Sequence, residues 1–494
     1  MFDLQYVGRP EIALRSADAL LLILPETAPR WRDLGSLLPD GIAATVPLLA
    51  KQVRVGDLGG SASTLVDHAS LKRLHLGLLP DRISRYHSPV RAESIRRIVK
   101  GTPPPDRSLA IVVMIDPKRD GRPPAHAVAN AVAKALPMIT LRSGAGTAKK
   151  VKLVVVGRDG TPVPLSKDER VLLESTRHAA RLVDLPPTEL NPTALAKEAR
   201  SLLRGQDRIT VKEIRGGALL DAKLGGIHAV GRAATEPPRL LHFAYAPARP
   251  RGPRVALVGK GITYDTGGLH IKARGAMEGM KGDMGGSAAV LGAFRAAIAA
   301  KPACRIDLVL CIAENAVGPL AYKPDDVIRM HSGKTVEINN TDAEGRLLLA
   351  DGCSYAARVL RADVVLDAAT LTGAQLIATG LNHAAVISND ARLERQLVEA
   401  GERSGDMVHP LPFAPEFYRS EFESPIADMR NSVKNRGNAQ TSCAAEFVHW
   451  HIADTDVRWG HIDLAGPAIR DERGTGFGVA LLRDAVLELS GAGG

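Results

Sequence analysis

The sequence predicts an α/β protein with two α/β domains, a smaller N-terminal domain and a larger C-terminal one. Two observations support this prediction. A chain of 494 residues is too long to form one compact core. Apolar runs of strand length also alternate with stretches of helical periodicity along most of the chain. We see no internal repeat and no long low-complexity segment that would indicate another architecture.

The N-terminal domain is predicted to span residues 1–165. It contains three apolar runs, expected to be buried strands of a mixed or parallel sheet: residues 18–25, 108–116 and 152–157. Residues 166–185 have apolar side chains at helical spacing, with Ser166 at the N-cap and Glu169 three positions later. Two prolines follow directly, so we predict a linker helix between the domains.

The C-terminal domain is predicted to span residues 186–494. Its expected strands are residues 254–260, 304–313, 362–371 and 383–389, and its expected helices are residues 285–300, 345–361 and 391–405. This alternation predicts a mixed sheet that is covered by helices on both faces.

Composition excludes several classes of protein. Apolar residues make up 45% of the chain and charged residues 24%, as in ordinary globular proteins. No secretory signal is visible, and no apolar run approaches the ~20 residues that a membrane span needs, so no membrane partner is expected. The four cysteines lack C-x-x-C spacing, which indicates reduced thiols and a cytoplasmic protein.

The net charge of +10 is concentrated between about residues 51 and 150. Such a basic region could bind an anionic partner such as nucleic acid. A solvated basic surface is the simpler interpretation.

Two segments contain clusters of charged residues at the carboxyl ends of predicted strands, where open α/β sheets hold their sites. These residues are Lys260, Asp265, Lys272 and Asp283 in the first segment, and Asp342, Glu344 and Arg346 in the second. Taken singly, Asp342 or Glu344 could simply lie in the first turn of a helix, and Asp283 could cap the helix near residue 285. Glycines surround every acid and permit close backbone approach, so the residues taken together indicate a site.

These segments resemble the leucine aminopeptidase family of dinuclear metallopeptidases. The matching text is VGKGITYDTGG, IK (residues 271–272), MKGDMGG and NNTDAEGRL, extended by DAATLTGA and HIDLAGPA over most of residues 180–494. The resemblance implies a catalytic metallo-aminopeptidase domain with two divalent ions, manganese or zinc, in each subunit. One ion would be held by Lys260, Asp265, Asp283 and Glu344. Asp265 and Glu344 would bridge to a second ion, which Asp342 also binds.

Elementary electrostatics agrees with that ligand set. Two unit charges ~4 Å apart interact by ~4 kcal/mol at an effective dielectric constant of 20, so four adjacent carboxylates repel one another strongly. Two dications would neutralise them. A lysine ligand is unusual, because it must lose a proton from a reference pKa of ~10.4. The oxygen-rich set suits manganese, magnesium or zinc.

The resemblance also implies how a peptide would be cleaved. Its amino terminus would bind one metal and its carbonyl oxygen the other, and a metal-activated water would attack the carbonyl. Lys272 would stabilise the oxyanion, and Arg346 would anchor a bicarbonate ion that serves as the base. The family assembles as a homohexamer.

Five residues match positions that line the side-chain pocket of the family: Met280, Thr370, Gly373, Ala465 and Ala468. They predict an apolar pocket for leucine or methionine. Ala468 is small where methionine is common, which suggests a roomier pocket. His270 stands where the family usually has serine; it could tune substrate binding, add a ligand, or be a tolerated rim residue.

Two alternatives to a simple aminopeptidase stay open. The basic N-terminal domain could bind nucleic acid, in addition to catalysis or instead of it. Another two-metal hydrolase, such as a phosphatase, would add basic residues and histidines for phosphate. The ligand set of one lysine, three aspartates and one glutamate fits an aminopeptidase better.

Overall fold

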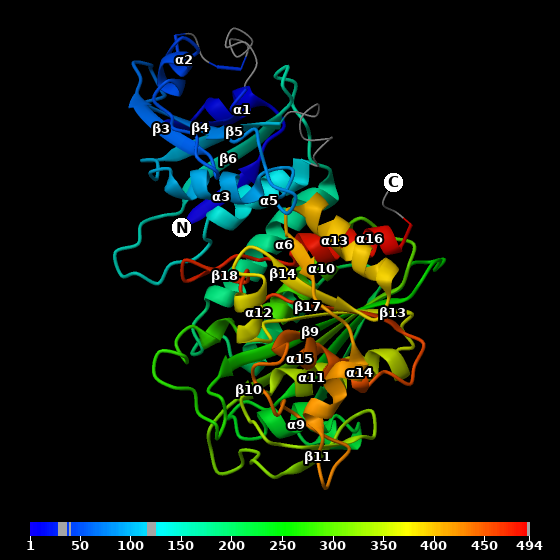
Figure 1. Ribbon diagram of the computed structural model, residues 1–494. Coiled ribbons are helices and arrows are strands. Elements are labelled where there is room, and N and C mark those ends of the chain that lie inside the picture. The colour runs from blue at the N-terminus through cyan, green and yellow to red at the C-terminus, as the bar shows by residue number, and fades with distance from the viewer. Residues whose placement is uncertain (28–36, 39–40, 116–124, 492–494) are drawn as a thin grey trace. The chain divides into compact units, whose positions relative to one another are not determined.

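The computed structural model describes residues 1–27, 37–38, 41–115 and 125–491 of the chain (Figure 1). Two compact units can be distinguished. The first contains Met1–Arg177 and Gly401–Met407, and the second contains His178–Ala400 and Val408–Gly494. The division falls inside helix α6 (Lys167–Asp184), which corresponds to the predicted linker helix.

The first unit is built on a six-stranded sheet in the order β1-β6-β5-β2-β4-β3. All neighbouring strands are parallel except β3, which pairs with β4 in the antiparallel direction. The strands are β1 (Phe2–Tyr6), β2 (Ala19–Pro25), β3 (Gly60–Leu65), β4 (Arg73–Leu79), β5 (Ser108–Met114) and β6 (Lys149–Val156). Residue 116, which we predicted to end the strand now seen as β5, lies outside the described residues.

Both faces of this sheet are buried, which explains its continuous apolar strands. In β2, Leu21 and Ile23 join the core cluster on one face, and Leu20 and Leu22 join the cluster on the other. The helices that cover the two faces are α3 (Ala92–Gly101) and α5 (Ala125–Ala135) on the first, and α1 (Pro10–Leu14) and α2 (Thr45–Ala50) on the second.

The second unit has an eight-stranded sheet in the order β15-β14-β17-β13-β9-β10-β8-β7. The four central strands, β17, β13, β9 and β10, are mutually parallel. Nearer the edges, β14 is antiparallel to β17, β8 is antiparallel to β10, and β7 is antiparallel to β8. The strands are β7 (Ile209–Arg215), β8 (Arg239–Tyr245), β9 (Val255–Asp265), β10 (Ile306–Asn315), β13 (Val364–Ala369), β14 (Ala384–Ser388), β15 (Val408–Pro410) and β17 (Arg458–Asp463).

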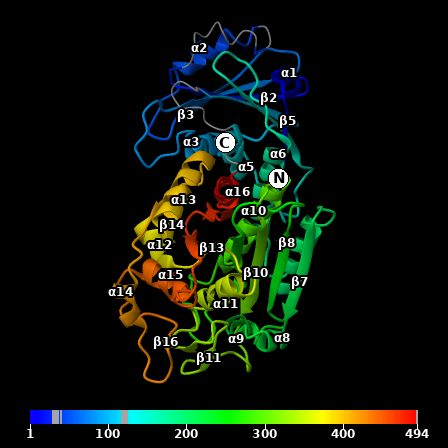
Figure 2. The same ribbon diagram turned by 90° about the vertical axis from the view of Figure 1, so that its right-hand side faces the viewer.

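Helices cover both faces of this sheet (Figures 1 and 2). A Cβ added to Gly259 of β9 would lie 2.5 Å from Val290 of helix α10 (Gly285–Ala299), which fixes the close packing on one face. On the other face, helix α11 (Gly345–Arg358) packs against β9 through Gly352. Helix α16 (Val479–Leu489) packs along α10, and α15 (Gln440–Trp450) packs along α11.

The predicted fold class and the predicted strands and helices of the second unit are therefore confirmed.

The remaining elements are α7 (Pro192–Leu202), α8 (Ala218–Asp221), α9 (Gly225–Gly231), α12 (Gly373–Ala378), α13 (Ala391–Ser404), α14 (Pro415–Tyr418), the short strands β11 (Val327–Arg329), β12 (Thr335–Glu337), β16 (Met429–Arg430), β18 (Ile469–Arg470) and β19 (Arg473–Gly474), and the 3-10 helices η2 (Met280–Gly282) and η3 (Arg419–Phe422). None of the helices in the described residues is both long and apolar enough to cross a membrane.

One edge of the large sheet collects the ends of its parallel strands. Strand β9 ends at Asp265, β10 at Asn315, β13 at Ala369 and β17 at Asp463. Because these strands are adjacent and parallel, the segments that follow them meet at this edge.

Candidate active site

Lys260 lies within β9, and its side chain is directed to the start of α11. Its ammonium group donates to Asp283 Oδ1 at 2.8 Å and contacts Glu344 Oε1 at 3.0 Å. A third bond runs to the carbonyl oxygen of Thr370, also at 2.8 Å. A Cβ on Gly345 would lie 2.6 Å from Lys260 Cε, so only glycine leaves room for this lysine.

Lys272 occupies the opposite side of the cluster. Its ammonium group lies 2.7 Å from Asp265 Oδ2 and 2.5 Å from Asp342 Oδ1. The other oxygen of Asp265 accepts from Asn315 Nδ2 at 2.8 Å and from the backbone N–H of Gly267 at 2.9 Å. Strand β10 therefore helps to orient the carboxylate that ends β9.

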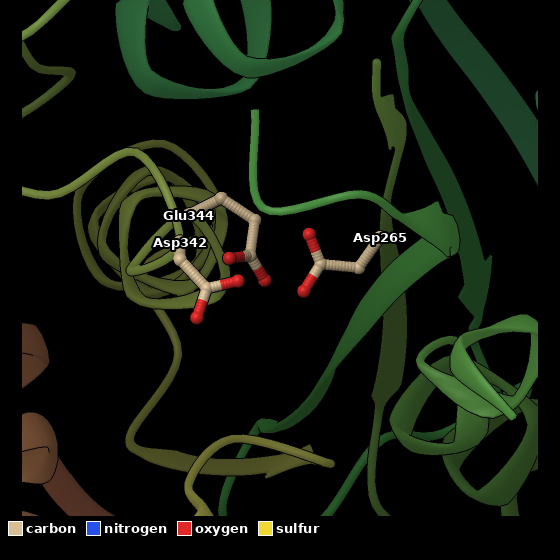
Figure 3. Close-up of side chains that lie close together, drawn as sticks. All are labelled: Asp265, Asp342 and Glu344. Atoms are coloured by element: carbon tan, nitrogen blue, oxygen red, sulfur yellow. The ribbon is translucent and has the colours of Figure 1, made fainter. Parts of the chain in front are cut away.

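Three of the acids converge on one point (Figure 3). Asp265, Asp342 and Glu344 each offer an oxygen, and these oxygens all lie within 4.8 Å of one another. Asp265 and Glu344 are buried, and Asp342 is partly exposed. The two clusters of charged residues in the sequence thus form one site.

The acids do not act as helix caps. Glu344 occupies the N-cap position of α11, yet its side chain makes no capping hydrogen bond. Asp283 precedes α10, where Met284 is the N-cap residue, and its Oδ1 instead accepts from Lys260 and from Thr370 Oγ1. Neither Glu344 nor Asp283 therefore caps a helix through its side chain.

Charge in the cluster is unbalanced, because four carboxylates face two ammonium groups. Burial, reinforced by neighbouring acids, raises the pKa of Asp283 and of Glu344 above their ordinary values. Burial alone would lower the pKa of Lys260, but Asp283 and Glu344 outweigh it and raise that pKa. Lys260 is therefore an ammonium ion in this arrangement, and a cation that bound to its nitrogen would have to displace a proton.

Arg346 lies in the first turn of α11, next to the acids. Its Nη1 donates to the backbone carbonyl oxygen of Asn431 at 3.0 Å. Its buried Nε has no hydrogen-bond partner among the described residues. Burial lowers the pKa of Arg346 to about 10, and the charge of Glu344 opposes that shift. A partly buried guanidinium with a free N–H donor is well suited to an anion.

A cleft of about 530 Å³ opens onto the cluster. All seven charged residues singled out in the sequence line it, together with four of the five residues expected to form the side-chain pocket: Met280, Thr370, Gly373 and Ala465. Ala468 is not a lining residue; it is 3% exposed, whereas its neighbour Ile469 lines the cleft. Its expected direct contact with substrate therefore finds no support in this geometry.

His270 is an exposed residue outside the lining of the cleft. Its backbone N–H donates to Thr341 Oγ1 at 2.8 Å, and its ring Nδ1 accepts from the backbone N–H of Thr341 at 3.1 Å. It thus braces the loop that precedes Asp342, a role closer to the predicted rim residue than to an extra metal ligand.

The sequence did not point to one wall of the cleft. Its residues lie in an irregular loop and at the start of α15, where neither periodicity nor a motif marks them. They are Ser432, Val433, Arg436 and Gln440. Asn340, Leu371 and Thr372 also line the cleft and lie inside the matching motifs, and Leu376 follows one of them closely.

The fold and the site define an α/β enzyme with a carboxylate-rich cleft at the carboxyl edge of its sheet. Residues 177–483 match the catalytic domain of the cytosol aminopeptidase family. The human protein described as probable aminopeptidase NPEPL1 is 48% identical over 413 residues, which cover 82% of this chain and 77% of that protein. Leucine aminopeptidase 1 of Caenorhabditis elegans is 40% identical over 417 residues, 82% of each chain.

A solved structure agrees with the sequence comparisons. The leucyl aminopeptidase from Trypanosoma cruzi superposes with a TM-score of 0.88 at 33% identity, over 98% of this chain and 97% of that chain. The chain therefore belongs to the cytosol aminopeptidase family. It is an aminopeptidase and thus a hydrolase.

Proposed function

We propose that the enzyme removes N-terminal leucine and other apolar residues from peptides, with two divalent metal ions held in the cleft. The observation that carries this proposal is the convergence of five side chains from three separate segments. These side chains are Lys260, Asp265, Asp283, Asp342 and Glu344.

The residues fit such ions. Their carboxylate oxygens are suitable ligands for manganese or zinc. Asp283 Oδ2 is buried and has no hydrogen-bond partner among the described residues, so it is available as a ligand. The excess of negative charge in the cluster, four carboxylates against Lys260, Lys272 and Arg346, also favours divalent cations over a ligand-free state. Ions held there would supply the Lewis acidity that amide hydrolysis needs.

The two catalytic groups of the chain would be Lys272 and Arg346. The ammonium group of Lys272, held by Asp265 and Asp342, could stabilise an oxyanion. Arg346 cannot serve as a base, because it stays protonated. Its planar fork could instead hold a bicarbonate ion that accepts the proton of the attacking water, as the family resemblance implies.

Preference for the first residue of the substrate would come from the part of the cleft lined by Met280, Thr370, Gly373 and Ala465. These side chains are mainly apolar, so leucine and methionine are the expected residues. A panel of aminoacyl amides tests this preference. Faster cleavage of the glycine or lysine amide than of the leucine amide would contradict it.

Hydrolysis of leucine amide by metal-stripped enzyme tests the proposed function. We expect no turnover after chelation and recovery when manganese, zinc or cobalt is added back. Full activity of protein shown by elemental analysis to contain no metal would contradict the proposal.

A cytoplasmic homohexamer is the assembly proposed from the family resemblance, and sedimentation of the purified protein tests its size. The relatives described above are named as aminopeptidases. None of these observations favours the nucleic-acid alternative, so we do not propose it.

A further inference from the structure

Asn431 follows strand β16 and lies far in sequence from the loop at residues 339–344, which carries Asp342 and Glu344. Its side chain is 0% exposed, and both of its polar atoms bond to that loop. Oδ1 accepts from the backbone N–H groups of Asn339 at 2.9 Å and Asn340 at 3.2 Å. Nδ2 donates to the carbonyl oxygens of Asn340 at 2.6 Å and Ala343 at 3.3 Å.

The backbone of Asn431 makes two further bonds. Its N–H donates to the carbonyl oxygen of Glu337 in β12 at 3.0 Å. Its carbonyl oxygen accepts from Arg346 Nη1 at 3.0 Å. One buried residue therefore connects the end of β12, the acidic loop and the arginine that begins α11.

We propose that Asn431 is a positioning residue that holds the loop at residues 339–344 and Arg346 in the geometry needed for metal binding and turnover. This inference rests on the proposed function. The loop brings Asp342 and Glu344 close to Asp265, so these like charges repel one another, and Lys260 and Lys272 offset only part of that repulsion. The bonds from Asn431 hold the loop in place against it.

Only a carboxamide can make this set of side-chain bonds. It combines two N–H donors on one atom with an acceptor that has two lone pairs. Aspartate has nearly the same volume and could still accept from Asn339 and Asn340. It would, however, place an oxygen against the carbonyl oxygens of Asn340 and Ala343, so repulsion would replace two bonds.

The variants Asn431→Ala and Asn431→Asp test this inference in the full-length protein. Substitution of a residue that orients metal ligands typically lowers metal affinity by about 10- to 100-fold. We therefore expect calorimetric titration with Mn²⁺ to show about 10- to 100-fold weaker binding in both variants. We also expect kcat for leucine amide to stay reduced at saturating Mn²⁺, because Arg346 loses its orientation.

Asn389→Ala is the control for loss of an asparagine that bridges backbone groups; Asn389 is exposed, whereas Asn431 is buried. The side chain of Asn389 also bonds to two backbone groups, and it lies outside the cleft. Its Oδ1 accepts from the backbone N–H of Trp459 at 2.7 Å, and its Nδ2 donates to the carbonyl oxygen of Val457 at 3.0 Å. This variant should lower Tm without changing Mn²⁺ affinity or kcat. A lower Tm with wild-type Mn²⁺ affinity and kcat in the Asn431 variants would overturn the inference.

A readout in metal-free protein separates this inference from the proposed function. Hydrogen exchange measured on peptides from residues 338–344 should be faster in both Asn431 variants and unchanged in Asn389→Ala. If the wild type neither binds Mn²⁺ nor cleaves leucine amide, the proposed function fails. The exchange data would still test whether Asn431 holds the loop at residues 339–344. If neither Asn431 variant yields folded protein, the residue is a folding determinant and the inference is wrong.

Discussion

The missing side chain of Gly345 allows Lys260 to reach the acids. The ammonium group of Lys260 is held between Asp283 and Glu344, and a Cβ on Gly345 would lie 2.7 Å from its nitrogen. Lys260 is buried, so moving away from such a Cβ would break its ion pairs with both acids. Metal binding and stability should therefore both suffer.

The variant Gly345→Ala should therefore lose metal binding and some stability. Gly345 is the first residue of α11, and breaking a buried ion pair typically costs about 3–5 kcal/mol, more than the ~1 kcal/mol by which alanine is favoured over glycine inside a helix, so Tm should fall. Displacement of Lys260 should lower Mn²⁺ affinity on the order of 10- to 100-fold. Calorimetry and thermal melts measure both. Gly217→Ala, where an added Cβ meets nothing within 4 Å, is the control. Wild-type Mn²⁺ affinity in Gly345→Ala would contradict the role given to Lys260.

Lys272→Ala and Arg346→Ala should lower turnover and leave metal content nearly intact. Loss of one group that stabilises an oxyanion typically lowers kcat by about 10²- to 10³-fold, and we expect that range for Lys272→Ala. Kinetics with leucine amide and elemental analysis of the same samples give both quantities. Lys323→Ala, a lysine outside the cleft, should behave as the wild type. Absence of both metals from either active-site variant would show that these residues are ligands.

The elements of the second unit differ in how well the sequence predicts them. Strands β9, β10 and β13 are predictable because they are buried on both faces and form continuous apolar runs. Strand β7 was missed because it lies at the edge of the sheet, and only Ile214 of its seven residues is buried. Long-range pairing rather than local pattern places such a strand.

The residues of the candidate site also differ in how well the sequence predicts them. Its charged residues are predictable, because they stand in dense glycine-rich motifs after strands. The wall formed by Ser432, Val433, Arg436 and Gln440 comes from an irregular loop that only the folded chain brings to the cleft. Ala468 is the instructive case: its match to a position of the family's side-chain pocket suggested a pocket residue, but packing buries it.

The residue that follows helix α15, His451, should make stability depend on pH. His451 is fully buried, and its Nδ1 lies 2.7 Å from Ser332 Oγ. Burial lowers its pKa to about 3, with Lys334 adding to the shift. The folded pKa is below the unfolded value of about 6.5, so this contribution to stability is present above pH 6.5 and is lost as the pH falls toward 3.

The variant His451→Asn should flatten this acid dependence. Asparagine can keep a bond to Ser332 but does not titrate. Between pH 6.5 and pH 5, the wild type should lose about 2 kcal/mol more unfolding free energy than the variant. Denaturant melts across that range measure the difference. Above pH 7, the unfolding free energies of the two proteins should change with pH in the same way. Parallel curves down to pH 5 would mean that His451 is already protonated in the folded protein.

At the scale of the whole molecule, two units with separate sheets share one chain, and the candidate site belongs entirely to the second. A ligand that binds only the folded state stabilises it by about 2.7 kcal/mol at a free concentration 100 times its Kd. Mn²⁺ should therefore raise Tm in a concentration-dependent way. Asp265→Asn and Asp342→Asn should abolish most of that rise. An equal rise in these variants would place the cation elsewhere on the protein.

The most direct test of the central claim is anomalous diffraction from crystals soaked in Mn²⁺. The account predicts two peaks in the cleft, held by Lys260, Asp265, Asp283, Asp342 and Glu344. A well-ordered crystal in which these side chains lie apart, with no peak between them, would contradict it.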